Sequence, residues 1–260
     1  MDISVVIVNY NVKEYIISCI QSIYKHSKSN LSFEIIVIDN NSQDGSCEKL
    51  KKEFPQISLI RNNTNAGFSV GVNQGVKVSK GKYIFILNPD TLFVEDCLSK
   101  LIKVADNYEK LGAIGPSLIT ETGSIQQSFW KKPSIINTIL SISHLDFLNF
   151  HKNYGFKKFN STKRVDSISG GAFLVLKKVY NKLKGFNENL FWMEDIDFCM
   201  RLRQSGYFTY FFHETEIIHF KGKSSQTDYK TAISNQLISK VKFFKKHHSK
   251  SKAVIILFLI

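Results

Sequence analysis

The sequence predicts an α/β fold with a mostly parallel central sheet and flanking helices. In residues 1–112, short apolar runs alternate with segments that have helical periodicity. Each apolar run ends in polar residues, which is typical of strands that are buried on both faces of a parallel sheet. The alternation implies right-handed crossovers, which place helices on both faces of the sheet.

The elements of this first half follow one another in order. The predicted strands are the largely apolar runs 3–8, 33–38, 57–60 and 83–87. Residues 13–26 carry apolar side chains at helical spacing, and a short helix follows residues 44–46 and ends near Glu53. Residues 68–79 and 95–108 are the remaining predicted helices of this half.

The second half has a different pattern, with a small antiparallel region. We expect strands at 113–119, 168–176, 207–212 and 217–220, a helix at 195–204 that Gly206 ends, and a long amphipathic helix at 227–247. Residues 121–165 are basic and aromatic, and their weak periodicity fits either a lid facing the acceptor or a helical excursion on the core. The aromatic residues concerned are Trp130, Phe147, Phe150, Tyr154, Phe156 and Phe159.

Composition limits the possible classes of protein. With 260 residues and 43% hydrophobic residues, the chain can form one large domain, or one domain with an appendage. The cysteines, Cys19, Cys47, Cys97 and Cys199, lie far apart in sequence, so we expect buried thiols and a reducing compartment. The N-terminus lacks the basic region of a signal peptide, which favours a cytoplasmic location.

The positive charge of the chain gathers near its C-terminal end. The net charge is +13, and lysines crowd residues 240–252 ahead of the apolar run 253–260. This pattern favours peripheral contact with an anionic membrane, on the inner face of a bacterial plasma membrane. A final core strand or the start of a membrane segment would also explain the apolar run. Nucleic acid is not expected, because stacking aromatics do not interleave with the basic residues.

Polar residues at strand ends are candidates for binding a phosphate-containing donor. Asp39 ends a predicted strand at the ligand-binding edge of the sheet, where it would bind a base or ribose, or would cap the next helix. Asn65 and Gly67 precede a helix whose N-terminus favours anions. No complete Gly-x-Gly-x-x-Gly motif is present, which argues against a nicotinamide oxidoreductase.

Two acidic clusters are candidates for metal binding and general-base chemistry. Asn88-Pro89-Asp90 follows the fourth strand, and one carboxylate there could bridge Mg²⁺ or Mn²⁺ to a diphosphate, or the tripeptide could be a turn with a helix cap. Glu194 and Asp195 open a helix, where acidic residues are also favoured by the helix dipole. Asp195 would be the general base.

Taken in order, these segments resemble the family 2 glycosyltransferases of GT-A fold, in particular their rhamnosyltransferase-like branch. The resemblance covers about residues 3–225, and its matching segments are 4–11, 37–46, 65–75, 87–90, 169–173, 191–197 and His219 with Gly222 and Ser224. It implies a GT-A domain over 1–225, with a donor half at 1–112 and an acceptor half at 113–225. Residues 226–260 would then form a C-terminal helix and a tail that associates with membranes.

The resemblance also implies roles for individual residues in an inverting transfer. By this resemblance, Asp90 and His219 bind the divalent ion, Mg²⁺ or Mn²⁺. The residues that bind the donor are Asn9, Tyr10, Asp39, Asn65, Gly67, Asn88 and Asp90. Asp195 takes the proton of the acceptor hydroxyl. The acceptor side consists of Gly170, Gly171, Trp192, Glu194 and Asp197.

Two departures from the family pattern refine this reading. The usual Asp-x-Asp motif has Asn88 in place of its first aspartate, so Asp90 would supply the negative charge that binds the metal ion. The Gln-x-x-Arg-Trp motif of processive synthases is absent, which favours a single transfer. The expected reaction moves a sugar, dTDP-rhamnose being the first candidate donor, to a saccharide or lipid-linked acceptor of bacterial surface polysaccharide. A sugar-1-phosphate nucleotidyltransferase and a non-catalytic glycan-binding module are the alternatives.

Overall fold

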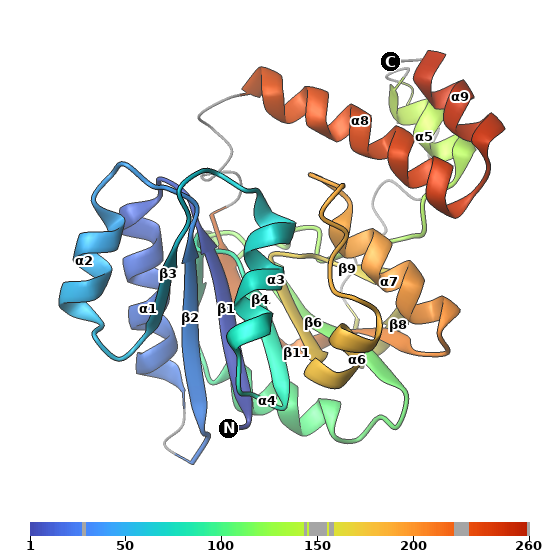
Figure 1. Ribbon diagram of the computed structural model, residues 1–260. Helices are drawn as coiled ribbons and strands as arrows, with labels where there is room; N and C mark the ends of the chain where they lie inside the picture. The colour runs from blue at the N-terminus through green and yellow to red at the C-terminus, as the bar shows by residue number, and fades with distance from the viewer. Residues whose placement is uncertain (28–29, 143–144, 146–154, 156–158, 221–228, 259–260) are drawn as a thin grey trace.

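A central sheet organises the computed structural model, which describes residues 1–27, 30–142, 145, 155, 159–220 and 229–258 (Figure 1). Within these residues the sheet has nine strands in the order β3-β2-β1-β4-β10-β6-β11-β5, and β8 pairs with β11. A second, two-stranded sheet joins β7 and β9. The predicted α/β class with a mostly parallel sheet is therefore confirmed.

The first half forms the parallel part of the sheet. Its strands are β1 (Ile3–Asn9), β2 (Phe33–Asp39), β3 (Ser58–Arg61) and β4 (Tyr83–Leu87), connected by α1 (Lys13–His26), α2 (Ser46–Glu53) and α3 (Phe68–Val78). In the register of the sheet, Asn9 lies beside Asp39 and Ile7 lies beside Leu87. The polar residues that follow these strands therefore meet at one edge.

The second half completes the sheet with mixed pairing. The first half also contributes β5 (Thr91–Phe93) and α4 (Cys97–Ala105). The elements that follow are β6 (Leu111–Ile119), β7 (Phe129–Trp130), β8 (Lys163–Val165), β9 (Ser167–Ile168), β10 (Ala172–Leu176), α6 (Lys177–Lys182), α7 (Glu194–Gln204) and β11 (Phe208–His219). β10 runs antiparallel between β4 and β6, whereas β11 runs parallel to β6 and antiparallel to β5. The pairing of β11 with β5 places His219 beside Thr91, next to Asp90.

Alternating side chains of the strands supply a separate core on each face of the sheet. In β1, Val5 and Ile7 belong to the cluster that α1, α2 and α4 cover, whereas Val6 and Val8 face α3, α6 and α7. Gly75 of α3 sits close to the sheet, because a Cβ at this position would lie 2.4 Å from Cγ1 of Val6. These packed faces hold the carboxyl edge of the sheet in place.

A separate helical unit lies above that edge (Figure 1). It consists of α5 (Ile135–Ile142), α8 (Tyr229–His247) and α9 (Lys250–Phe258), around a small core of Phe243, Phe244, Ala253 and Ile256. The described part of the chain contains no helix that is both long and apolar enough to cross a membrane.

The structure corrects several expected elements. The strands expected at 207–212 and 217–220 are one strand, β11, whose register shifts between Phe212 and Glu216. Glycines break the strand expected at 168–176 into β9 and β10, and residues 250–258 form a helix rather than a core strand. Phe147, Phe150, Tyr154 and Phe156 lie outside the described residues. All four cysteines are buried and unpaired, as predicted.

Candidate active site

Asn9 and Asp39 form a buried polar pair where β1 and β2 end. Asn9 Nδ2 donates to Asp39 Oδ2 over 2.8 Å and to Ser46 Oγ over 2.9 Å, and the Ser42 amide donates to Asp39 Oδ1 over 2.9 Å. Both side chains are fully buried. Asp39 therefore orders the loop after β2 through the expected Asx-type turn, but it does not cap α2, whose N-cap is Gly45 without a side-chain hydrogen bond. Its binding of a donor stays a prediction. Tyr10, beside it, is half-buried.

The loop before α3 approaches the acceptor side. Asn65 Oδ1 accepts a hydrogen bond from the Gly67 amide over 3.1 Å, and Gly67 has a φ of +86° that favours glycine. The Phe191 ring lies 3.6 Å from the position that a Cβ on Gly67 would occupy. Residues of the predicted donor and acceptor sides are therefore neighbours here.

Asp90, Asn88 and His219 converge at the start of β5. His219 Nε2 lies 3.5 Å from Asp90 Oδ1 and 3.4 Å from Asn88 Nδ2. His219 Nδ1 lies 3.1 Å from Gln126 Oε1, which can only accept, so Nδ1 carries a proton and Nε2 is the nitrogen that faces Asp90. Gln126 thus fixes the tautomer that suits a metal ligand. Sequence reasoning missed Gln126, because an isolated glutamine has no recognisable signature.

These residues fit a divalent ion that is shared with a substrate. Among the described residues, no cluster of three or more histidine, cysteine, aspartate or glutamate side chains could hold a metal by itself. Mg²⁺ sites, however, often use only one or two carboxylates together with substrate phosphates and water. Asp90 is 2% exposed and lies 3.5 Å from Nε2 of His219, so a carboxylate oxygen and an imidazole nitrogen are close enough to share one ion.

Gly170 and Gly171 join this group to Asp195. The Gly170 amide donates to Asp195 Oδ2 over 2.9 Å. A Cβ on Gly171 would lie 3.6 Å from both Asn88 Nδ2 and His219 Cε1. Asp195 therefore contacts Gly170, and Asn88 and His219 lie beside the neighbouring Gly171, although Asn88 and Asp195 are more than a hundred residues apart in sequence. The expectation that these residues meet at one site agrees with this geometry.

The two carboxyls at the start of α7 have unequal proton affinities. Burial raises the pKa of Glu194 well above its usual range, and the neighbouring charge of Asp195 raises it further. Burial also raises the pKa of Asp195, although hydrogen bonds from Gly170 and Ile196 counter it. Glu194 Oε2 is buried with no hydrogen-bond partner among the described residues, as a protonated carboxyl tolerates better than a charged one. Asp195 is the carboxyl that ionises first and can accept a proton.

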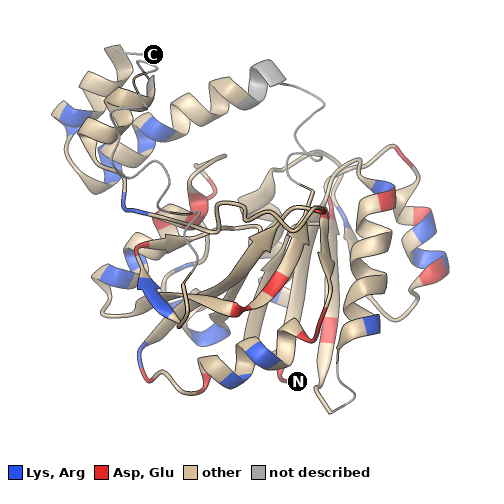
Figure 2. Cartoon of the chain, turned by 180° about the vertical axis from the view of Figure 1, so that it is seen from behind, with Lys and Arg blue, Asp and Glu red and all other residues tan. Residues whose placement is uncertain are grey.

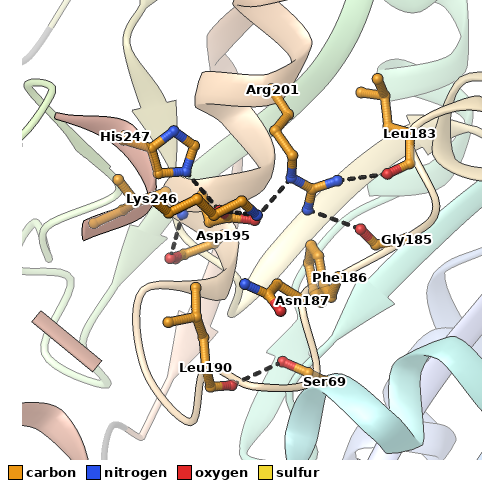
Figure 3. A network of polar contacts seen from close by, with 12 residues as sticks. Ser69, Leu183, Gly185, Phe186, Asn187, Leu190, Asp195, Arg201, Lys246 and His247 are labelled. Carbon is orange, nitrogen blue, oxygen red and sulfur yellow. Dashed lines mark hydrogen bonds and ion pairs between the residues drawn. The ribbon is translucent and has the colours of Figure 1, made fainter. Parts of the chain in front are cut away.

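Asp197, expected on the acceptor side, lies elsewhere. It is fully buried and accepts from Arg201 Nε over 2.8 Å, while its Oδ1 lies 2.7 Å from Lys246 Nζ and 2.6 Å from His247 Nε2. Arg201 also donates to the carbonyls of Leu183 and Gly185 (Figure 3). The residue faces away from solvent because it ties α7 to the end of α8, so the acceptor-side expectation is wrong for it.

Helix α8 also forms hydrogen bonds with residues 189–192, the loop that precedes Asp195. Ser239 Oγ accepts from the amides of Phe191 and Trp192 over 3.2 and 3.3 Å, and Lys242 Nζ donates to the Asn189 carbonyl over 2.9 Å. The Trp192 side chain stays 39% exposed and available to a ligand. Sequence analysis did not identify Ser239, whose only signal is its polarity on the buried side of a helix.

The comparisons with solved structures agree with this fold. The structure of GalNAc-T7 with UDP, GalNAc and Mn²⁺ superposes with a TM-score of 0.72 at 16% identity, covering 94% of this chain and 48% of that one. A mannosyltransferase from Pyrobaculum calidifontis in complex with GDP-Man and Mn²⁺ gives a TM-score of 0.63 at 15% identity, covering 99% of this chain and 68% of that one. The chain thus spans about half the length of GalNAc-T7.

Curated relatives agree in sequence as well. The N-acetylglucosaminyl-diphospho-decaprenol L-rhamnosyltransferase of Mycobacterium tuberculosis is 24% identical over 233 residues, 83% of this chain and 75% of the relative. An uncharacterized glycosyltransferase of Methanocaldococcus jannaschii is 28% identical over 212 residues, 79% of this chain and 66% of the relative. The model of the glycosyl transferase family 2 matches residues 4–184, including the Asn88–Asp90 segment and both glycines. The chain therefore belongs to glycosyl transferase family 2, with rhamnosyltransferases among its relatives.

Proposed function

We propose that this protein transfers one sugar from a nucleoside-diphosphate donor to a hydroxyl of a saccharide or lipid-linked acceptor, with inversion and with the help of Mg²⁺ or Mn²⁺. The observation that carries the proposal is the contact of Gly170 with Asp195 and of Gly171 with Asn88 and His219. On this proposal, the proton acceptor Asp195 and the diphosphate-binding residues Asn88 and His219 would lie on either side of two residues that lack side chains. A reacting sugar can therefore approach both.

The residues of the chain divide the reaction between them. Asp195 takes the proton of the acceptor hydroxyl as its oxygen bonds to the anomeric carbon, and the bond from that carbon to the diphosphate oxygen breaks. Asn88, Asp90 and His219 hold the diphosphate end of the donor. A divalent ion bound there would neutralise the charge that develops on the leaving group. The raised pKa of Glu194 favours its protonated form, which would keep a second charge away from Asp195.

The relatives support finer proposals about substrates. The name of the mycobacterial relative describes rhamnosyl transfer to a diphospholipid-linked N-acetylglucosamine. We accordingly propose dTDP-rhamnose as donor and a lipid-linked glycan of the bacterial surface as acceptor. Mn²⁺ in the two solved glycosyltransferases named above supports the divalent ion. A lipid-linked acceptor and the lysines of residues 240–252 support work at the inner face of the plasma membrane.

A transfer assay with a matched pair of variants tests this proposal. Nucleotide sugars are first screened for thermal stabilisation with and without Mn²⁺, and the best donor is then assayed with a lipid-linked N-acetylglucosamine acceptor. Asp195→Asn is expected to bind the donor as the native protein does and to lose at least about a hundredfold in kcat, the usual lower range for a general base. Glu194→Gln, which keeps a neutral side chain, should retain most activity. Equal activity of both variants would overturn the assignment of the base.

A further inference from the structure

We propose that a basic cavity beside α7 and α8 binds the phosphate of an anionic phospholipid, while the exposed apolar faces of α5 and α9 enter the bilayer beside it. The inference rests on the proposed function only in placing the protein at a membrane. Nothing in the transfer reaction itself requires this cavity, because Asp195 and His219 are not among its lining residues.

The cavity lies between the helical unit and the main domain. Its volume is about 310 Å³, and its lining includes Lys132, Asp166, Arg203, Gln204, His247 and His248. Asp166, the only carboxylate in this lining, already accepts from the Lys132 amide over 3.0 Å and from Arg203 Nη1 over 2.6 Å. Its charge is therefore engaged, and the lining as a whole is cationic.

The lowered pKa of His248 is consistent with positive charge around the cavity. Burial lowers the pKa of His248, and the nearby charges of Lys252, His247 and Lys132 lower it further. The His248 Nε2 atom is shielded from solvent and has no hydrogen-bond partner among the described residues. A phosphate in the cavity would offset the surrounding positive charge and favour the protonated ring of His248, whose Nε2–H would donate a hydrogen bond to a phosphate oxygen. The cationic side chains of Lys132 and Arg203 in the same lining suit a phosphate better than a neutral ligand.

The surface next to the cavity is apolar and unusually exposed. Phe258 is 86% exposed, Leu257 60% and Val254 47% on α9, and Ile136 is 67% exposed on α5, which packs against α9. Residues 229–258 contain many lysines and no aspartate or glutamate. Figure 2 shows the helical unit from behind, with lysines and no acidic residues on its described helices. An apolar face with a wholly cationic border is the arrangement of a helix that lies in the interface of an anionic bilayer.

The choice of a lipid phosphate over a free anion follows from this neighbourhood. Free phosphate would leave the large apolar side chains of α9 in water, whereas a phospholipid supplies both an anionic headgroup and a hydrocarbon phase. Each lysine near an anionic bilayer surface adds to the binding free energy. The lysines of residues 240–252 would therefore strengthen the membrane binding of the apolar face of α9. His247 lines the cavity and also contacts Asp197, so the occupied site would adjoin α7, whose first turn contains Asp195.

A soluble lipid tests the cavity separately from the general attraction of a charged surface. Dihexanoyl phosphatidylglycerol, kept below its micelle concentration, is titrated into the full chain while the His248 resonances are followed by NMR. These resonances should shift and the pKa of His248 should rise. Lys132→Gln should weaken binding about tenfold, as expected for loss of one charge-assisted contact. The control Lys250→Gln removes an equal charge outside the cavity and should leave the affinity unchanged.

Vesicles test the apolar face. The Leu257→Ser/Phe258→Ser variant should lose more than about tenfold in affinity for vesicles of phosphatidylcholine mixed with phosphatidylglycerol. Val78→Ser, at an exposed valine of α3, should bind them like the native chain. Unchanged His248 resonances, equal losses in Lys132→Gln and Lys250→Gln, or inorganic phosphate binding as tightly as the soluble lipid would each overturn the proposal. Transfer to a water-soluble acceptor should persist in all variants, so a failed lipid site is distinguishable from a failed enzyme.

Discussion

Asp197→Asn is the substitution whose effect on stability follows most directly from the structure. The carboxylate is fully buried among Arg201, Lys246 and His247. Burial alone would raise its pKa, but hydrogen bonds from His247 and Lys246 and the charge of Arg201 outweigh burial and lower the pKa from 3.8 to about 2. At about 1.4 kcal/mol per pKa unit, the ionised form contributes about 2 kcal/mol to the free energy of unfolding.

The sign of the pH dependence is fixed by this lowered pKa. The contribution is fully present above the unfolded pKa near 3.8 and is lost as the pH falls towards 2. Asparagine keeps the shape of the side chain but leaves Arg201 and Lys246 without their counter-charge. We therefore expect Asp197→Asn to be about 2 kcal/mol less stable at pH 7 and to differ little from the native chain at pH 2.

Urea unfolding at both pH values measures this difference. Asp106→Asn is the matched control, because Asp106 forms a 2.7 Å ion pair with Lys82 but its side chain is 49% exposed. Exposed pairs of this kind contribute about 0–1 kcal/mol. If Asp197→Asn were no less stable than Asp106→Asn at pH 7, or if its deficit stayed constant down to pH 2, the reasoning about the buried carboxylate would be refuted.

Three further predictions concern the site itself. Ser239→Ala removes the acceptor shared by the amides of Phe191 and Trp192, so it should cost about 1 kcal/mol of stability and raise KM for the acceptor substrate. Ser251→Ala should change neither quantity in the same denaturation and kinetic assays. Gln126→Leu frees the ring of His219 and should weaken Mn²⁺ binding about 10–100-fold; equal affinity by titration calorimetry would refute the orienting role. Because the pKa of Asp195 is raised by burial, kcat should fall with decreasing pH at a value above 3.8, and a profile flat to that pH would contradict its role as base.

The fold was predictable because its main elements have strong local signals. β1, β2 and β4 are continuous apolar runs, and their connecting helices carry clear apolar faces. The elements that were wrong depend on distant partners instead. β11 continues through polar residues between Phe212 and Glu216 because β6 supplies a long neighbouring strand, and no local pattern contains that information.

The candidate site was predictable to the extent that its residues follow strands. Asp90 and Asp195 stand out beside apolar runs, whereas Asp197 has the same local context and a different environment. Asp197 is buried because Lys246 and His247 of α8, some fifty residues later in the sequence, pack against it. Gln126 and Ser239 likewise gain their roles from contacts across the fold, so sequence spacing could not identify them.

A crystal structure with Mn²⁺ and the donor identified by thermal stabilisation tests the central claim most directly. The account predicts an anomalous Mn²⁺ peak bound by Asp90 and His219, with the donor diphosphate on the same ion and the anomeric carbon turned towards Asp195. A metal ion bound away from Asp90, or a donor sugar whose anomeric carbon lies on the side of the glycines remote from Asp195, would contradict it.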